Sequence, residues 1–131
     1  MTQAALPALI TLLTLLLLFG CAVHVGRMRG KHRIMPPATH GHPEFERVYR
    51  VQVNTTESAA MFLPALWLAA TYWSAHWAAA LGALWLIGRL WHWAGYTRAA
   101  EKRGSGFGLS VLALLALLLG AAWGIVRTLA A

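Results

Sequence analysis

Long apolar runs alternate with shorter polar segments along the whole chain. This pattern predicts four helices, at residues 4–25, 43–73, 77–96 and 109–127. A helix rises 1.5 Å per residue, so about twenty residues cross the roughly 30 Å hydrocarbon core of a bilayer. We therefore expect one domain over residues 1–131, an all-α integral membrane protein built as a bundle of four transmembrane helices.

The second predicted helix carries a polar stripe in its first half. Pro43 suits the first position of a helix, and Glu44 and Glu46 place negative charge near the positive end of the helix dipole. The stripe follows at steps of three, four and three residues, which puts its members on one helix face: Arg47, Arg50, Asn54 and Glu57. At about thirty residues this helix is longer than the hydrocarbon core, and Pro64 is expected to kink it.

A second polar group belongs to the third helix. Arg89, His92 and Tyr96 recur at helical spacing within an otherwise apolar run. An arginine at this depth costs about 2.5 kcal/mol or more when it faces lipid, so Arg89 should point inward. Glu57 is a candidate ion-pair partner for it. The short turn at Ser74–His76 makes the second and third helices antiparallel neighbours.

Charge and composition fix the class and the orientation. Of the 131 residues, 59% are hydrophobic and 11% are charged, whereas soluble domains carry about 25% charged residues. The formal net charge is +7, and seven of the eleven Lys and Arg residues lie in two loops, residues 26–42 and 97–108. Bases that flank apolar runs favour membrane orientation over nucleic-acid binding and predict cytoplasmic loops with both termini outside.

Other local patterns are weak signals of function. Cys21 lies alone in an apolar run and is expected to pack as a small hydrophobe. His32, His40 and His42 share a loop but lack the cysteines or the spacing of a zinc site, so no metal site is expected. The glycine-rich segment 104–108 suggests a flexible lead-in to the fourth helix, and Gly120 and Gly124 form a small-xxx-small pattern that permits close helix contact.

The polar groups of the second and third helices and of the first loop should gather at one end of the bundle. Their bases outnumber their acids, so they would form a positively charged pocket beside apolar walls. Such a pocket suits a small polar anion with several carboxylates, next to a lipophilic partner. The stripe could equally join helices within or between subunits, and the residues alone leave both readings open.

The polar stripe also carries a family resemblance. The segment FERVYRVQVNTTE at residues 45–57, the pair Pro36–Pro37 before it, and the RL and GYTR segments at 89–90 and 95–98 resemble the MAPEG family, the membrane-associated proteins of eicosanoid and glutathione metabolism. The resemblance implies a homotrimer that binds glutathione between neighbouring subunits. It places the glutathione contacts on Arg29, Arg50, Gln52, Asn54, Glu57, Arg89 and Tyr96. Arg103 matches the catalytic arginine that holds the thiol.

The resemblance implies a glutathione transferase that acts on a lipophilic electrophile, with reduction of lipid hydroperoxides as an accompanying activity. Gly30 stands where leukotriene-forming members carry an arginine, which argues against that specificity. Ser58 and His92 replace tyrosines that help line the pocket. Two interpretations of His92 stay open, a substitute hydrogen-bonding residue and an interfacial histidine, and the second is slightly favoured. Two other functions are weighed: a non-catalytic lipid-binding or scaffold protein, and a small exporter with Glu57 as its proton carrier. Chain size and basic loops suggest a bacterial inner membrane.

Overall fold

The computed structural model describes residues 2–131. It contains four long α-helices and one short 3-10 helix within that range: α1 Thr2–His32, α2 Pro43–Tyr72, α3 Ala75–Arg98, η1 Ala100–Arg103 and α4 Gly104–Ala130. No strand occurs in residues 2–131. The all-α prediction is therefore confirmed, and the helices occur where the apolar runs predict them.

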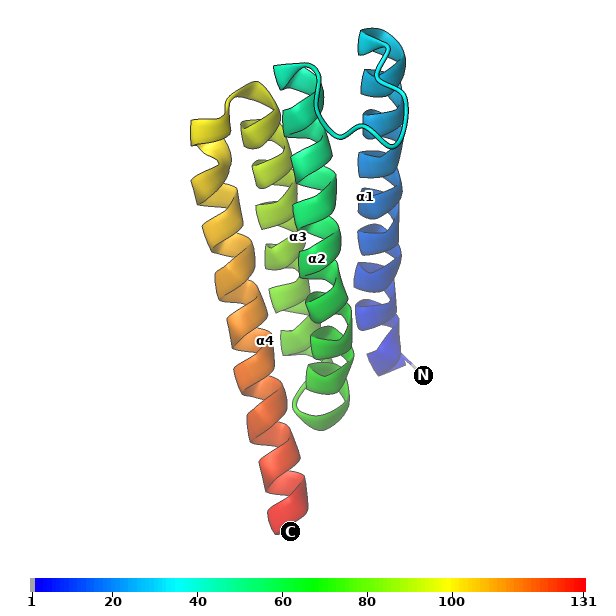
Figure 1. Cartoon of the computed structure of the whole chain (residues 1–131). Coiled ribbons are helices and arrows are strands. Elements are labelled where there is room, and N and C mark those ends of the chain that lie inside the picture. The colour runs from blue at the N-terminus through cyan, green and yellow to red at the C-terminus, as the bar shows by residue number, and fades with distance from the viewer. Residues whose placement is uncertain (1) are drawn as a thin grey trace.

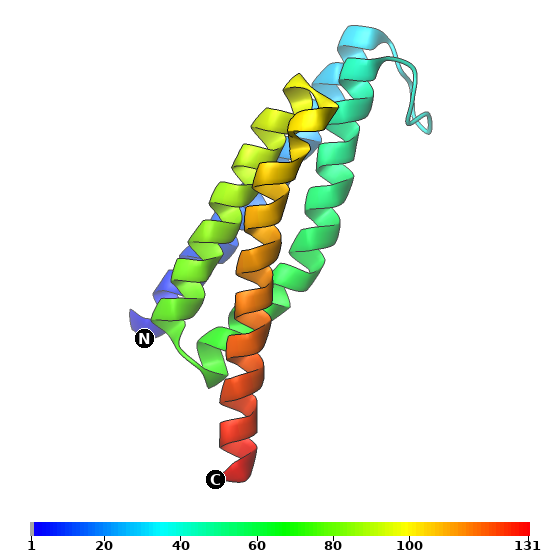
Figure 2. The same ribbon diagram turned by 90° about the vertical axis from the view of Figure 1, so that its left-hand side faces the viewer.

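The helices run side by side in an up-and-down bundle (Figure 1). The α1–α2 loop and the α3–α4 connection lie at one end, while both termini lie at the other. α2 and α3 form the centre, because α1 packs against both of them on one side and α4 packs against both on the other. Figure 2 shows that α2 bends in its lower part, as expected from the proline that it contains, Pro64.

Sequence signals explain where α2 and α3 begin. Pro43 occupies the first turn of α2, and the Nδ1 atom of His42 accepts a hydrogen bond from the backbone N–H of Glu44 at 3.1 Å. Ser74 caps α3, with its Oγ 3.3 Å from the backbone nitrogen of Trp77. Both caps satisfy backbone donors that the first turn of a helix leaves free.

Two predicted helix boundaries were wrong. α1 continues to His32, seven residues past its predicted end, because its basic last turns leave the apolar region without breaking the helix. The segment 104–108 is the first part of α4 and does not form a flexible lead-in. Gly106 is buried there, and a Cβ atom at this position would lie 2.3 Å from the backbone nitrogen of His92 and 2.6 Å from the carbonyl oxygen of Gly88. Glycine is therefore required by the close approach of α3 and α4.

The apolar core lies between the central helices. Phe62 of α2 stacks on Trp85 of α3 with ring centroids 3.9 Å apart, and both side chains are fully buried. The indole N–H of Trp85 donates to Ser58 Oγ at 3.0 Å, so Ser58 satisfies the polar atom of this buried ring. At the far end Gly120 packs under the ring of Trp73, which shows that the small-xxx-small pattern serves contact within the chain. Cys21 is buried as predicted.

Apolarity is unequal among the helices. Within the described range, two segments are long and apolar enough to cross a membrane, Gln3–His32 and Ala100–Ala130. The first lies within α1 and the second contains α4, and both helices expose many leucines. These features indicate a membrane protein. The polar residues of α2 and α3 lower the apolarity of the central pair, so four crossings remain a prediction.

Candidate functional site

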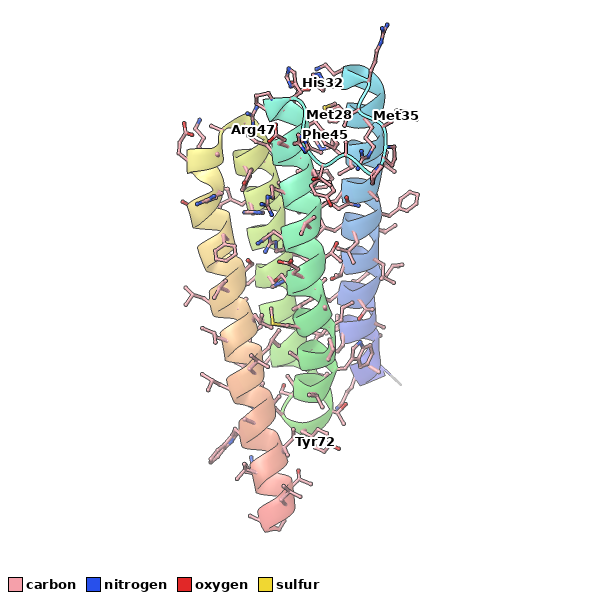
Figure 3. The ribbon with its side chains drawn as sticks, viewed as in Figure 1. Met28, His32, Met35, Phe45, Arg47 and Tyr72 are labelled. Atoms are coloured by element: carbon pink, nitrogen blue, oxygen red, sulfur yellow. The ribbon has the colours of Figure 1, made fainter. Side chains whose placement is uncertain are left out.

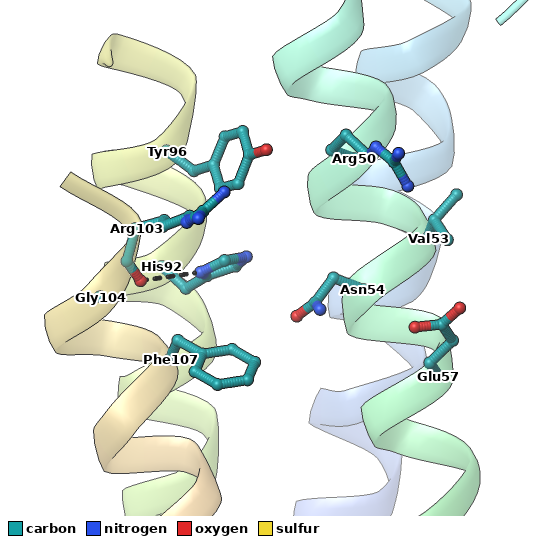
Figure 4. Close-up of a pocket in the computed structure, with 9 residues that line it drawn as sticks. All are labelled: Arg50, Val53, Asn54, Glu57, His92, Tyr96, Arg103, Gly104 and Phe107. Carbon is teal, nitrogen blue, oxygen red and sulfur yellow. Dashed lines mark hydrogen bonds between the residues drawn. The ribbon is translucent and has the colours of Figure 1, made fainter. Parts of the chain in front are cut away.

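A cavity of about 530 Å³ opens between α2 on one side and α3, η1 and α4 on the other. Its lining residues are Arg50, Val53, Asn54, Glu57, His92, Tyr96, Arg103, Gly104 and Phe107. Figure 4 shows the lining residues of α2 on one side and those of α3, η1 and α4 on the other, with Asn54 pointing toward the opposite wall. The volume is in the range of small-molecule sites.

Three of the four members of the predicted polar stripe lie together on the α2 wall. Arg50, Asn54 and Glu57 all line the cavity, as residues on one helix face should. The side chains of Arg50 and Glu57 are exposed and make no hydrogen bond or ion pair with any other residue of the described chain. The cavity therefore contains charges of both signs that the protein itself leaves free.

Arg89 lies behind this wall, outside the cavity lining. It is 1% exposed, and its Nη2 donates to Asn54 Oδ1 at 2.7 Å. Its Nη1 lies 3.4 Å from Ser110 Oγ, which in turn donates to the carbonyl oxygen of Phe107 at 2.8 Å. The ion pair expected between Arg89 and Glu57 does not form: the guanidinium bonds to Asn54, and Glu57 makes no ion pair within the described residues. The buried guanidinium joins α2, α3 and α4.

The opposite wall combines a buried histidine with an exposed arginine. His92 is 2% exposed, which corrects its interpretation as an interfacial histidine. Its Nδ1 lies 3.2 Å from the carbonyl oxygen of Arg103, an atom that can only accept, so Nδ1 carries the hydrogen. In the neutral ring Nε2 then presents a lone pair, and it has no partner in residues 2–131. This contact also fixes the backbone at Arg103, whose side chain extends along the cavity toward Tyr96 (Figure 4).

Besides Arg89, two further sequence-predicted site residues lie outside the cavity lining. Gln52 lies about 200° around the axis of α2 from Asn54, because each residue turns an α-helix by about 100°. It therefore faces away from the cavity of its own chain and is absent from its lining. Arg29 bonds to the first loop: its Nη1 donates to the carbonyl oxygen of Ala38 at 2.8 Å and lies 3.4 Å from that of Ile34. Its guanidinium also lies over the ring of Phe45.

The junction of α1 and α2 holds its own polar cluster. Glu44 accepts from Lys31 Nζ at 2.8 Å and lies 3.3 Å from His32 Nε2. The ring of His32 stacks on that of His42 at 3.7 Å. Figure 3 shows this end of the molecule, with Met28, His32 and Phe45 gathered beside the first loop. The cluster links the end of α1 to the start of α2, on either side of the first loop.

A second cavity, of about 420 Å³, adjoins the first. It shares Arg50 and Tyr96 with it and extends toward the first loop. Arg47, the first residue of the predicted stripe, lines this second cavity and donates through Nε to the carbonyl oxygen of Thr97 at 3.2 Å. The stripe is thus divided, with one end tying α2 to α3 and the rest facing the main cavity.

Sequence reasoning missed three apolar or small lining residues, Val53, Gly104 and Phe107. Val53 could have been found, because it adjoins Asn54 on the same side of α2. Phe107 and Gly104 lay in the segment interpreted as flexible, and only the helical start of α4 brings them to the cavity. Phe107 gives the site an apolar wall beside its charges.

Comparison with known proteins identifies the family. A sequence model of the MAPEG family matches residues 7–123. An uncharacterized protein of Synechocystis sp. is 51% identical over 120 residues, which are 92% of this chain and 88% of that protein. Microsomal glutathione S-transferase 2 of Homo sapiens is 46% identical over 99 residues, 74% of this chain and 67% of that protein. Leukotriene C4 synthase of Cavia porcellus is 46% identical over 101 residues, 77% and 67% of the two chains.

The match includes α2 and α3 and most of α1 and α4, and the resemblance stated from the sequence rested largely on the α2 stripe. A match over this share of the chain, with relatives at this identity, is sufficient to assign the family. This chain is a member of the MAPEG family.

Proposed function

We propose that this protein is a membrane-embedded glutathione transferase, which joins the thiol of glutathione to lipophilic electrophiles. One observation carries the proposal: Arg50, Asn54, Glu57, Tyr96 and Arg103, expected separately as glutathione contacts, line one cavity. The names of two relatives, a glutathione S-transferase and leukotriene C4 synthase, support the same chemistry.

The free charges of the cavity match those of glutathione. The tripeptide carries two carboxylates, one α-ammonium group and a thiol. Arginine forks bind carboxylates, and a carboxylate binds an ammonium group. Arg50 therefore suits a carboxylate of the ligand, Glu57 suits its α-amino group, and Arg103 suits the sulfur. The apolar ring of Phe107 offers a surface for a lipophilic second substrate.

The chemistry needs a thiolate. A free thiol has a pKa near 8.5, so little of it is ionised at neutral pH. A cation beside the sulfur, away from bulk water, could lower the thiol pKa by about two units. The thiolate sulfur then forms a bond to the electrophilic carbon while the leaving group departs or an epoxide ring opens, and the thiol proton has already passed to water. Arg103 stabilises the anion, and the cavity holds the nucleophile in place.

A complete site requires a second copy of the chain. Gln52 and Arg29 cannot reach a ligand in the cavity of their own chain, and the cavity is open on one side. We propose that a neighbouring subunit of a homotrimer supplies both, with Arg29 using the guanidinium nitrogens that the first loop leaves free. The basic loops would face the cytoplasm of a bacterial cell, because positive residues are retained on that side.

The test is glutathione binding to the purified protein in detergent, followed by the ultraviolet absorbance of the thiolate. The unsubstituted protein should bind glutathione at millimolar concentration or below and show the thiolate signal. Arg103→Ala should abolish this signal while most of the binding remains. Turnover of a model electrophile at pH 7 should fall by about 25-fold, because the thiolate fraction drops from about 0.76 to about 0.03 when the thiol pKa rises from about 6.5 to about 8.5. The matched control is Lys102→Ala, which removes the neighbouring exposed base outside the cavity.

The same preparations separate the alternative functions. A lipid-binding scaffold protein or an exporter needs neither glutathione nor a thiolate, so absence of binding at millimolar glutathione would overturn the proposal. The arginines that line the cavity with Glu57, Arg50 and Arg103, suit an anionic ligand better than proton-coupled export. Reduction of a lipid hydroperoxide, assayed on the same samples, tests the accompanying peroxidase activity.

A further inference from the structure

Arg89 is a buried cation that the proposed chemistry does not use. It is 1% exposed, and no acidic side chain in residues 2–131 pairs with it. Its Nε has no hydrogen-bond partner in that range. A buried charge without a counterion is costly, so its retention inside the bundle calls for a specific task. Its shortest contact, 2.7 Å to Asn54 Oδ1, ends on a residue that lines the cavity.

The chemistry of this contact fixes the polarity of Asn54. A carboxamide has one accepting oxygen and one donating nitrogen, and it can usually rotate to present either of them. A guanidinium only donates, so it holds the oxygen of Asn54 on the buried side. The nitrogen is then the atom that remains free to donate to a ligand in the cavity that Asn54 lines. Asn54 therefore presents the donors of its amide nitrogen to a ligand.

We propose that Arg89 is a positioning residue that acts on glutathione through Asn54. It locks the amide so that the nitrogen donates to a carbonyl or carboxylate oxygen of the ligand. Burial behind Asn54 keeps the guanidinium itself away from the ligand. This inference rests on the proposed function, and it assigns an indirect role to a residue that the family resemblance places among the glutathione contacts.

The same guanidinium also bridges the two walls. Through Ser110 it connects to the carbonyl oxygen of Phe107 on the opposite wall. The contact to Ser110 is long, at 3.4 Å, and the contact to Asn54 is short. Orientation of the amide is thus the stronger of the two effects, and removal of the serine hydroxyl provides a control.

A double-mutant cycle tests the inference. Glutathione affinity is measured by calorimetry on four proteins in detergent: the unsubstituted chain, Asn54→Ala, Arg89→Met and the double variant. Loss of one hydrogen bond to a charged ligand weakens binding by about tenfold, and we expect this loss in each single variant. The double variant should bind no more than about twofold weaker than Asn54→Ala, because Arg89 has no effect once Asn54 is gone.

Each outcome decides one point. Losses that multiply to about 100-fold in the double variant would mean that Arg89 contacts the ligand independently, and would overturn the inference while glutathione binding itself stands. Absence of binding to the unsubstituted protein would overturn the proposed function and this inference with it. Ser110→Ala should leave the affinity unchanged within about twofold, since its contact to Arg89 is long.

A second variant covers the case in which Arg89→Met does not fold. Asn54→Asp gives the buried guanidinium a charged partner, so the melting temperature should rise above that of the unsubstituted protein. The cavity now receives an acceptor in place of a donor, and affinity should fall below that of Asn54→Ala. An Asn54→Asp variant that binds as tightly as the unsubstituted protein would overturn the inference. A purely structural role of Arg89 would not separate stability from affinity in this way.

Discussion

Two polar regions lie toward the same end of the bundle, and they differ in how their charges are satisfied. At the α1–α2 junction the charged groups find partners within the chain: Glu44 with Lys31 and His32, and Arg29 with loop carbonyl groups. In the cavity, Arg50, Glu57 and Arg103 have no side-chain partner among residues 2–131. The first arrangement closes a loop, whereas the second leaves binding capacity for a ligand. Charge density alone would not have distinguished the two regions.

The largest effect should come from the backbone contact that shapes the open region. Gly106→Ala would place a Cβ atom 2.3 Å from the backbone nitrogen of His92, and backbone atoms cannot move aside as a flexible side chain can. We expect a loss of about 2–3 kcal/mol of stability or more, with loss of glutathione binding. Thermal unfolding in detergent measures the first and calorimetry the second.

The matched control on the same helix is Gly108→Ala, where a new Cβ atom meets nothing within 4 Å. Stability there should be unchanged or should rise by up to about 1 kcal/mol, because alanine favours a helix. Equal behaviour of the two variants would contradict the close contact between α3 and α4.

The next effect concerns a free charge of the cavity. Glu57→Gln removes the proposed partner of the ligand's α-amino group, and glutathione affinity should fall by about 10- to 100-fold. Because Glu57 makes no ion pair in the described chain, the melting temperature should stay the same. Glu101→Gln, an exposed acid outside the cavity, serves as the control for loss of one negative charge. A Glu57→Gln variant that is less stable but binds glutathione normally would mean that Glu57 is satisfied within the chain, as the charged groups of the α1–α2 junction are.

A smaller effect tests the second copy of the chain. Gln52 faces away from its own cavity, so Gln52→Ala can change glutathione affinity only through a neighbouring subunit. Loss of one neutral hydrogen bond predicts a decrease of about fivefold. The measurement is calorimetry combined with the mass of the assembly by light scattering. Unchanged affinity in a sample of proven trimers would remove Gln52 from the site.

The smallest effect belongs to the closed region. Lys31→Ala removes one partner of Glu44, but the pair is solvent-exposed and His32 remains beside the carboxylate. Exposed ion pairs contribute little to stability, so neither the melting temperature nor the glutathione affinity should change measurably. A clear loss of affinity in this variant would show that the two regions are coupled and would weaken the distinction between them.

Periodicity was sufficient to predict much of the fold and one wall of the site. The 3.6-residue repeat placed Arg50, Asn54 and Glu57 together, since their relative positions depend on one helix only. Contacts between helices were harder to predict. The predicted pairing of Arg89 with Glu57 was wrong, because opposite charge does not determine how far along each helix two side chains lie or where they point. The guanidinium of Arg89 bonds to Asn54 instead.

The segment 104–108 shows a different limit. Its glycines have low helix propensity, and the sequence alone favours a flexible segment. Packing overrides that preference, because Gly106 lets α4 approach the backbone of α3. Phe107 and Gly104 were missed for the same reason. The end of α1 was misplaced because hydropathy marks where a chain leaves an apolar environment, whereas a helix continues until its backbone is interrupted.

The unequal apolarity of the four helices has a consequence for biosynthesis. α1 and α4 belong to segments apolar enough to partition into lipid individually, but α2 and α3 carry the polar stripe and the buried Arg89. A translocon that releases helices one at a time would expose that arginine to acyl chains before Asn54 could meet it. We therefore expect the α2–α3 hairpin to leave the translocon as a unit, after its short turn at Trp73 and Ser74 has formed. The ligand site would then be partly assembled before α4 is synthesised.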